Sequence, residues 1–284
     1  MLPILVSIGP LKIYTFGVFL VLAFFWASFL LWKNIRLTSY KEEEIFDGLF
    51  LSLFFGLFIG RLFYVLMHFS DFGLDFLKFI LINGFPGLSI VGVMTGGFLT
   101  MFLYTNAKKI DFSEALDYFV SPLLLAFSLG KIGAFFSGEE VGSVTNFFLK
   151  IKYPGYDGLR HLTPLYEAII FALAAYVSYR LLFEIRKDRF RHGFSLVFFF
   201  WTFSLTYFAF DNIKADHLYL AGVSFNGIVS GVLLLTTSLF FVYYFRSGIL
   251  GFINKHGHKF FKKIHNRPKG KTPGGKGKDT KTNR

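Results

Sequence analysis

The chain of 284 residues contains no cysteine. It therefore has no disulfide, no thiolate metal site and no thiol nucleophile of its own. Charged residues are also scarce, at 17% of the chain against roughly 25% in an ordinary soluble domain. These absences exclude a small disulfide-stabilised fold and a zinc–thiolate protein, and they argue against a water-soluble domain.

Apolar residues take the place of the missing charge. They make up 54% of the chain, and 42 residues are phenylalanine. A helix needs about 20 apolar residues to cross the hydrocarbon core of a bilayer. Seven segments approach or meet this length: 13–32, 48–69, 88–104, 119–137, 164–183, 194–210 and 223–245. The sequence predicts an all-α membrane protein, a polytopic bundle of about seven transmembrane helices that occupies residues 1–245.

The net charge of +12 is concentrated in residues 246–284, which hold twelve lysines and arginines and a single acid, Asp279. This composition predicts a basic, disordered tail. Basic and acidic residues nearly balance elsewhere, so we expect no nucleic-acid partner. With the N-terminus outside, nine further lysines and arginines fall in inside loops and six in outside segments. The positive-inside rule then places the C-terminal tail in the cytoplasm.

Six of the charged residues within or next to the spans share one half of the bilayer under this topology, whereas Arg180 lies near the inner end of its span and can reach the surface. The six are Arg61, Lys131, Glu139, Glu140, Glu167 and Lys214. A basic group at mid-helix costs about 2.5–3.5 kcal/mol to insert, so such residues usually face the bundle interior and a function. We expect a cationic site that is open to the outer leaflet and suits a phospholipid head group. Structural pairing, for example of Arg61 with Glu167, is the alternative.

The stretch GKIGAFFSGEEVG (130–142) interrupts the fourth apolar run with small and charged residues. Gly130, Gly133 and Gly138 permit either close helix packing or a broken helix at membrane depth. We expect the stretch to break the helix, so that Lys131 meets a lipid phosphate and Glu139 orients neighbouring cations. Helix packing through the glycines is the alternative.

Four segments, in order, resemble motifs of the prolipoprotein diacylglyceryl transferase (Lgt) family, of which the chain is identified as a divergent member. The segments are GPLKIYTFG (9–17), GRLFYVL (60–66), GKIGAFFSGE (130–139) and RHLTPLYE (160–167). The matching positions are Arg61, Tyr64, Gly130, Gly133, Gly138, Glu139, Arg160, His161, Leu165, Tyr166 and Glu167. Lys131 stands where the family has arginine, and Val91 stands where it has a histidine tied to activity.

The resemblance implies transfer of a diacylglyceryl group from phosphatidylglycerol to the lipobox cysteine thiol of prolipoproteins, the first step of bacterial lipoprotein maturation. It implies a multi-pass protein of the bacterial plasma (inner) membrane. Its partners would be phosphatidylglycerol and the prolipoprotein signal peptide, with no nucleic acid, cofactor or metal, and we expect a monomer. Because the sulfur nucleophile belongs to the substrate, the chain needs no cysteine.

The resemblance also suggests roles for individual residues. Arg61 and Lys131 would stabilise the phosphate, and His161 would be the base for the thiol. The substrate-binding candidates are Tyr64, Gly130, Gly133, Gly138, Glu139, Tyr166, Glu167 and Lys214. Two alternatives stay open at this point: a family member that binds phospholipid or lipoprotein without catalysis, and a small transporter.

The charge asymmetry generates a prediction about topology. Reporter fusions after residues 105 and 190 should report the cytoplasm, and a fusion within 145–160 should report the exterior. A reversed pattern would contradict both the orientation and the assignment of the charged residues to the outer leaflet.

Overall fold

The structure, a computed structural model, describes residues 2–9, 11–81, 85, 87–215, 219–220 and 223–247. The chain divides into two compact units, Met1–Thr237 and Ser238–Arg284. The first unit contains all the features described below except the last residues of helix α9 (Phe225–Tyr244). Apart from two residues, the predicted basic tail (246–284) lies outside the described residues, so its disorder stays a prediction.

Seven helices among the described residues are long and apolar enough to cross a membrane, which confirms the predicted polytopic bundle. They are α1 (Thr15–Ile35), α2 (Glu42–Met67), α5 (Ile90–Lys108), α6 (Phe112–Ser137), α7 (Thr163–Ile185), α8 (Phe194–Asp211) and α9 (Phe225–Tyr244). The largest differences from the predicted spans are at the starts of α2 and α6. There a polar first turn continues the helix beyond the apolar run, because a helix does not stop where hydrophobicity stops.

Local sequence signals explain these two early starts. Helix α2 opens with three consecutive glutamates, which the positive end of the helix dipole favours. Helix α6 opens after Asp111, whose side chain accepts a hydrogen bond from the Glu114 backbone N–H at 2.8 Å. Aspartate at this capping position satisfies one of the free N–H groups of the first turn.

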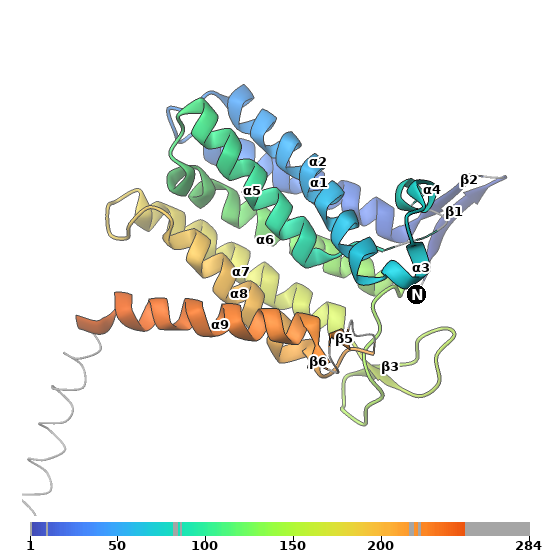
Figure 1. The fold of residues 1–284 in the computed structure, drawn as a ribbon. Helices are drawn as coiled ribbons and strands as arrows, with labels where there is room; N and C mark the ends of the chain where they lie inside the picture. The colour runs from blue at the N-terminus through green and yellow to red at the C-terminus, as the bar shows by residue number, and fades with distance from the viewer. Residues whose placement is uncertain are drawn as a thin grey trace, which may run out of the picture. The chain divides into compact units, whose positions relative to one another are not determined.

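Short strands and two short helices, which the apolar pattern does not predict, lie at one end of the bundle (Figure 1). They are β1 (Ile4–Ile8), β2 (Leu11–Tyr14), α3 (Phe69–Phe72), α4 (Phe76–Ile80), β3 (Lys150–Ile151), β4 (Arg160–His161), β5 (Tyr219–Leu220) and β6 (Val223–Ser224). The strands pair two by two in antiparallel hairpins, β1 with β2, β3 with β4 and β5 with β6. We call this end the hairpin end; it is the end that the charge asymmetry predicts to lie outside.

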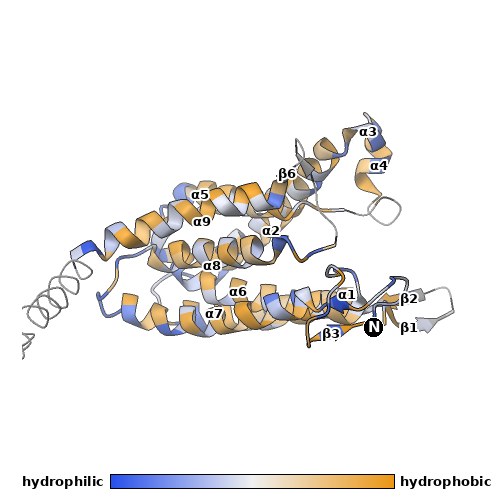
Figure 2. Ribbon diagram, turned by 90° about the horizontal axis from the view of Figure 1, so that it is seen from below, coloured by the Kyte–Doolittle hydropathy of each residue, from blue (hydrophilic) through white to orange (hydrophobic). Residues whose placement is uncertain are grey.

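The helices of the first unit pack as neighbours in the membrane. Helix α2 packs along α5, both α1 and α7 pack along α6, and α8 contacts α6 and α7. A buried apolar cluster fills the space between α6, α7 and α8: Val120, Leu124, Phe171, Ala174, Ala175, Phe199, Phe203 and Tyr207. Apolar residues also cover the outward faces of the helices (Figure 2). This pattern is typical of helices surrounded by lipid, because lipid does not drive apolar side chains inward.

Gly92 and Gly96 of GLSIVGVMTGG (87–97) serve helix packing. A Cβ on Gly92 would lie 2.9 Å from Gly60 Cα and 3.0 Å from the Ile59 carbonyl oxygen of α2. A Cβ on Gly96 would lie 2.7 Å from Ile59 Cβ. The backbones of α2 and α5 can approach this closely only because side chains are missing from the contact.

This packing predicts that Gly92→Ala destabilises the protein by about 1–3 kcal/mol, the usual cost of overpacking. Gly97→Ala is the matched control, because its Cβ would meet only the Ser52 carbonyl oxygen, at 3.5 Å. Thermal unfolding of the purified variants in one detergent measures the difference. Equal unfolding temperatures for the two variants would contradict the close contact between α2 and α5.

Candidate functional site

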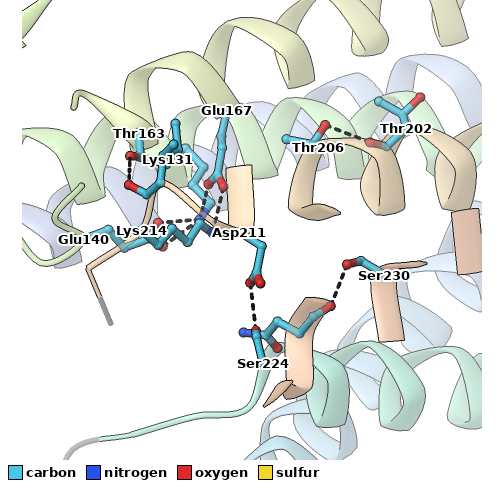
Figure 3. Close-up of polar contacts among 12 residues, drawn as sticks. Lys131, Glu140, Thr163, Glu167, Thr202, Thr206, Asp211, Lys214, Ser224 and Ser230 are labelled. Atoms are coloured by element: carbon cyan, nitrogen blue, oxygen red, sulfur yellow. Dashed lines mark hydrogen bonds and ion pairs between the residues drawn. The ribbon is translucent and has the colours of Figure 1, made fainter. Parts of the chain in front are cut away.

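Four charged side chains meet at the hairpin end (Figure 3). Lys131 on α6 places its Nζ 2.6 Å from Glu167 Oε2 of α7. The same Nζ donates to both carboxylate oxygens of Glu140, at 2.7 and 2.6 Å. Lys214, which follows α8, places its Nζ 2.7 Å from Glu167 Oε1. Each oxygen of Glu167 therefore faces one ammonium group, and we call these four residues the charge cluster.

The members of the charge cluster differ in exposure. The side chain of Glu167 is 0% exposed and that of Lys131 8%, whereas Lys214 is 16% and Glu140 40% exposed. Both ammonium groups also face the ring of Tyr207 on α8, at 5.2 and 4.4 Å from its centroid. A tyrosine ring attracts cations through the negative potential of its face. The two lysines and two glutamates cancel in charge, which limits the cost of burying them.

Backbone pairing after α6 brings the cluster together. Residues 141–143 make backbone hydrogen bonds of 2.8–3.1 Å with 213–215 on one side and with His161 on the other. Gly142 occupies the middle of this segment, where a Cβ would lie 2.7 Å from the His161 Cβ. This pairing places Lys214, and Glu140 just before residue 141, beside the first turns of α7.

The stretch GKIGAFFSGEEVG ends helix α6 and does not break it. Helix α6 continues through Lys131 to Ser137, and Gly138, with φ at 78°, donates its N–H to the Ala134 carbonyl oxygen at 3.0 Å. The expectation of a broken helix is therefore wrong. The apolar residues on both sides of Lys131 keep the backbone helical, and a left-handed glycine ends the helix where the side chains turn polar.

Glu140, and not Glu139, contacts the cations. Glu139 is exposed and makes no ion pair among the described residues. Burial raises the pKa of the Glu140 carboxyl, but the ammonium groups of Lys131 and Lys214 outweigh burial and hold this pKa below its usual value. Glu140 is therefore an anion at neutral pH, whereas no ion pair among the described residues supports the orienting role expected of Glu139.

Arg61 is buried away from the charge cluster, and the two share no contact among the described residues. Its Nε donates to the Phe79 carbonyl at 3.0 Å, and its two Nη atoms donate to the Gly87 and Lys78 carbonyls, both at 2.8 Å. The guanidinium joins α2 to α4 and to the segment that enters α5. Its burial thus has a structural cause, and the pairing with Glu167 left open by the sequence does not occur.

The aromatic candidate residues lie near the charge cluster or near Arg61. His161 is half-buried next to the ring of Tyr166, and its Nδ1 is buried with no hydrogen-bond partner among the described residues. Tyr166 donates its hydroxyl to the Leu149 carbonyl at 2.9 Å. Tyr64 stacks on His68 near Arg61, with 4.2 Å between the ring centroids. No contact among the described residues orients the His161 ring as a base, so its catalytic role stays a prediction.

An apolar cavity of about 220 Å³ lies between α1, α2, α5 and α6. Its lining includes Val93 near the start of α5 and Met101 further along the same helix. Only Ser28 and Ser52 contribute hydroxyl groups to the wall. Such a cavity accepts hydrocarbon and excludes a charged head group.

The two remaining candidate glycines have different surroundings. A Cβ on Gly133 would lie 2.5 Å from Phe19 Cβ, so this glycine allows α6 to pack closely on α1. A Cβ on Gly130 would meet nothing within 4 Å. Gly133 therefore serves packing, and packing does not explain Gly130.

Tyr207 and Gly142 are absent from the site predicted by sequence, and Glu140 was counted among its charges but was given no role. Tyr207 is a polar-tipped ring in a run rich in phenylalanine, four residues before Asp211 and so on the same helix face. This position on the helix face is a weak sequence signal that Tyr207 belongs to a polar site. Gly142 had no signal, because its close contact with His161 depends on pairing between distant segments.

Comparison with known proteins bears directly on this site. The family described as prolipoprotein diacylglyceryl transferase matches residues 3–243. The chain belongs to the prolipoprotein diacylglyceryl transferase family. The match spans the seven helices, apart from the last residue of α9, and the whole charge cluster.

Individual members of the prolipoprotein diacylglyceryl transferase family agree with this placement. A phosphatidylglycerol–prolipoprotein diacylglyceryl transferase of Clostridium botulinum is 31% identical, covering 85% of this chain and 96% of its own length. One from Clostridium perfringens is 30% identical, covering 81% of this chain and 92% of its own length. One from Desulfotalea psychrophila is 28% identical, covering 82% of this chain and 89% of its own length. The similarity thus extends over nearly the full length of the relatives.

The contacts of Arg61 generate a stability prediction. Arg61→Leu removes three hydrogen bonds to backbone carbonyls, and we expect it to destabilise the protein by on the order of 3 kcal/mol. Arg180→Leu, at an exposed arginine of α7, is the matched control and should change stability little. Thermal unfolding in detergent compares the two variants. Equal stability would show that Arg61 is free to serve an external anion.

Proposed function

We propose that this protein transfers a diacylglyceryl group from phosphatidylglycerol to the lipobox cysteine thiol of prolipoproteins, the first step of lipoprotein maturation, in the bacterial inner membrane. The observation that carries the proposal is a pair of ammonium groups held at one end of a seven-helix bundle of this family. The names of the relatives supply the lipid and the protein substrate.

The reaction replaces a carbon–oxygen bond with a carbon–sulfur bond. The substrate thiolate attacks the terminal carbon of the diacylated glycerol, to which the phosphate is bonded. The bond from this carbon to the phosphate oxygen breaks, and glycerol phosphate leaves with the bonding electrons. The thiol proton goes to a base, for which His161 is the candidate on this chain. Because negative charge grows on the leaving phosphate, fixed cations beside it lower the barrier.

The arrangement of the site supports this assignment. Lys131 and Lys214 are held in place by Glu167, so little reorganisation is needed when charge develops near them. The cavity between α1, α2, α5 and α6 offers apolar space for the acyl chains. Arg61 would act indirectly, by holding α4 and the start of α5.

Complementation tests the proposal most directly. A bacterium depleted of its own transferase is supplied with this gene, and mass spectrometry follows the mass increase of a prolipoprotein. Lys131→Arg should preserve or raise transfer, since it keeps the charge. Lys131→Met, neutral and similar in length, should reduce transfer at least about a hundredfold, the scale of losing one electrostatic contact in a transition state.

Membrane abundance is matched between variants, because insertion differs for charged and neutral side chains. Lys150→Met, at an exposed lysine of β3, is the control for the loss of one positive charge. Full transfer by Lys131→Met would mean that this lysine only balances its carboxylates. Lipid binding without transfer by the wild-type protein would favour the alternative of a family member that has lost catalysis.

A further inference from the structure

We propose that Glu140 is a displaceable counterion: in the resting protein its carboxylate occupies the place on Lys131 that the phosphodiester of a lipid head group takes when substrate binds. This inference rests on the function proposed above. It starts from the difference between the two carboxylates of the charge cluster. Both contact Lys131, but only Glu140 is free to leave.

Glu167 is held by its burial and by ion pairs with two lysines. Its side chain is fully buried on α7, and each of its oxygens faces one ammonium group at 2.6 or 2.7 Å. Glu140 has a side chain that is 40% exposed, and both its oxygens accept from the single Nζ of Lys131. Removing Glu167 would leave Lys131 with Glu140 alone and would take from Lys214 its ion pair in the charge cluster, whereas moving Glu140 leaves each lysine in contact with one oxygen of Glu167.

The backbone around Glu140 needs no rearrangement for this motion. Gly138 ends α6 just before it, and residues 141–143 just after it are fixed by backbone hydrogen bonds to 213–215 and to His161. Rotation of one partly exposed side chain is therefore sufficient. Side-chain rotation at an exposed position is fast compared with the turnover of an enzyme.

The charges favour an exchange of one monoanion for another. Two lysines and two glutamates sum to zero, and without the Glu140 carboxylate the cluster carries one net positive charge. A phosphodiester such as the head group of phosphatidylglycerol carries one negative charge, so it restores neutrality in a buried site where net charge is costly. A zwitterionic head group, whose own cation cancels its phosphate, gains less from the exchange.

The net charge of the cluster also favours release of the product. After transfer, the leaving group is a phosphomonoester, which carries about −1.5 to −2 charges at neutral pH. The cluster would then hold excess negative charge. Return of Glu140 and departure of glycerol phosphate together restore neutrality, so Glu140 is a positioning residue that acts through Lys131 on both binding and release.

Native mass spectrometry of the full chain in detergent, titrated with phosphatidylglycerol, tests the inference. Glu140→Gln removes the internal competitor but keeps the shape of the side chain. We expect the apparent Kd for phosphatidylglycerol to fall about tenfold, the factor that corresponds to one hydrogen bond to a charged group. A residue with a merely structural role would not strengthen lipid binding when changed.

Three controls sharpen the result. Asp157→Asn removes the same charge from an exposed position of the same loop and should leave the Kd unchanged. Glu140→Asp keeps the carboxylate and should stay near the wild type. The double variant Lys131→Met/Glu140→Gln should lose the gain, because the cation that receives the phosphodiester is gone.

Binding of phosphatidylglycerol by Glu140→Gln that equals or falls below wild-type binding overturns the inference. Displacement of the lipid by inorganic phosphate at equal concentration would show a site for free phosphate, and would also overturn it. The binding assay contains no prolipoprotein, so it is independent of transfer. Tighter binding by Glu140→Gln together with no transfer by the wild type would reject the proposed function alone.

Discussion

The buried carboxylate of Glu167 is the interaction on which the hairpin end depends. It lies in the first turns of α7, fully shielded, with Lys131 of α6 on one oxygen and Lys214 of the chain after α8 on the other. A single buried charge would be too costly in a membrane, and breaking a buried pair costs roughly 3–5 kcal/mol. The three segments must therefore stay together for any of these charges to remain inside.

Among the described residues, helices α2, α4 and α5 are held together without ion pairs to the charge cluster. Helices α2 and α5 approach through glycines, and Arg61 fastens α4 and the entry of α5 by donating to three carbonyls. Between this helix pair and the pair of α1 and α6 lies an apolar cavity. The protein thus combines a polar, charge-balanced centre at the hairpin end with an apolar cavity between its helices.

Lysine at position 131 fits the surroundings that the structure gives it. An ammonium is a compact point charge that can face carboxylates on opposite sides, as Nζ does with Glu140 and Glu167. A guanidinium would present a planar fork instead. Val91, which the resemblance places where the family has a histidine, offers no titratable group, and its carbonyl accepts a hydrogen bond within α5. If the proton of the thiol passes to this chain, it must pass to another residue.

The sequence alone determined the membrane class, the seven helices to within a few residues in most cases, and the presence of charged side chains such as Lys131 at the ends of apolar runs. Each follows from local composition: apolar length defines a span, and a charge inside a span needs a partner. The family resemblance pointed to Glu167, Tyr166 and His161. These inferences need no knowledge of how distant segments pair.

Only the tertiary structure decided which charges meet. Arg61 and Lys131 have the same pattern in the sequence, one cation in one apolar run, yet one donates to carbonyls and the other binds two carboxylates. Glu139 and Glu140 are adjacent, and the choice between them depends on the direction of the chain after Gly138 and on its pairing with 213–215. Depth in the membrane follows from position along a helix, whereas contact follows from helix rotation and loop pairing, which no local pattern of residues contains.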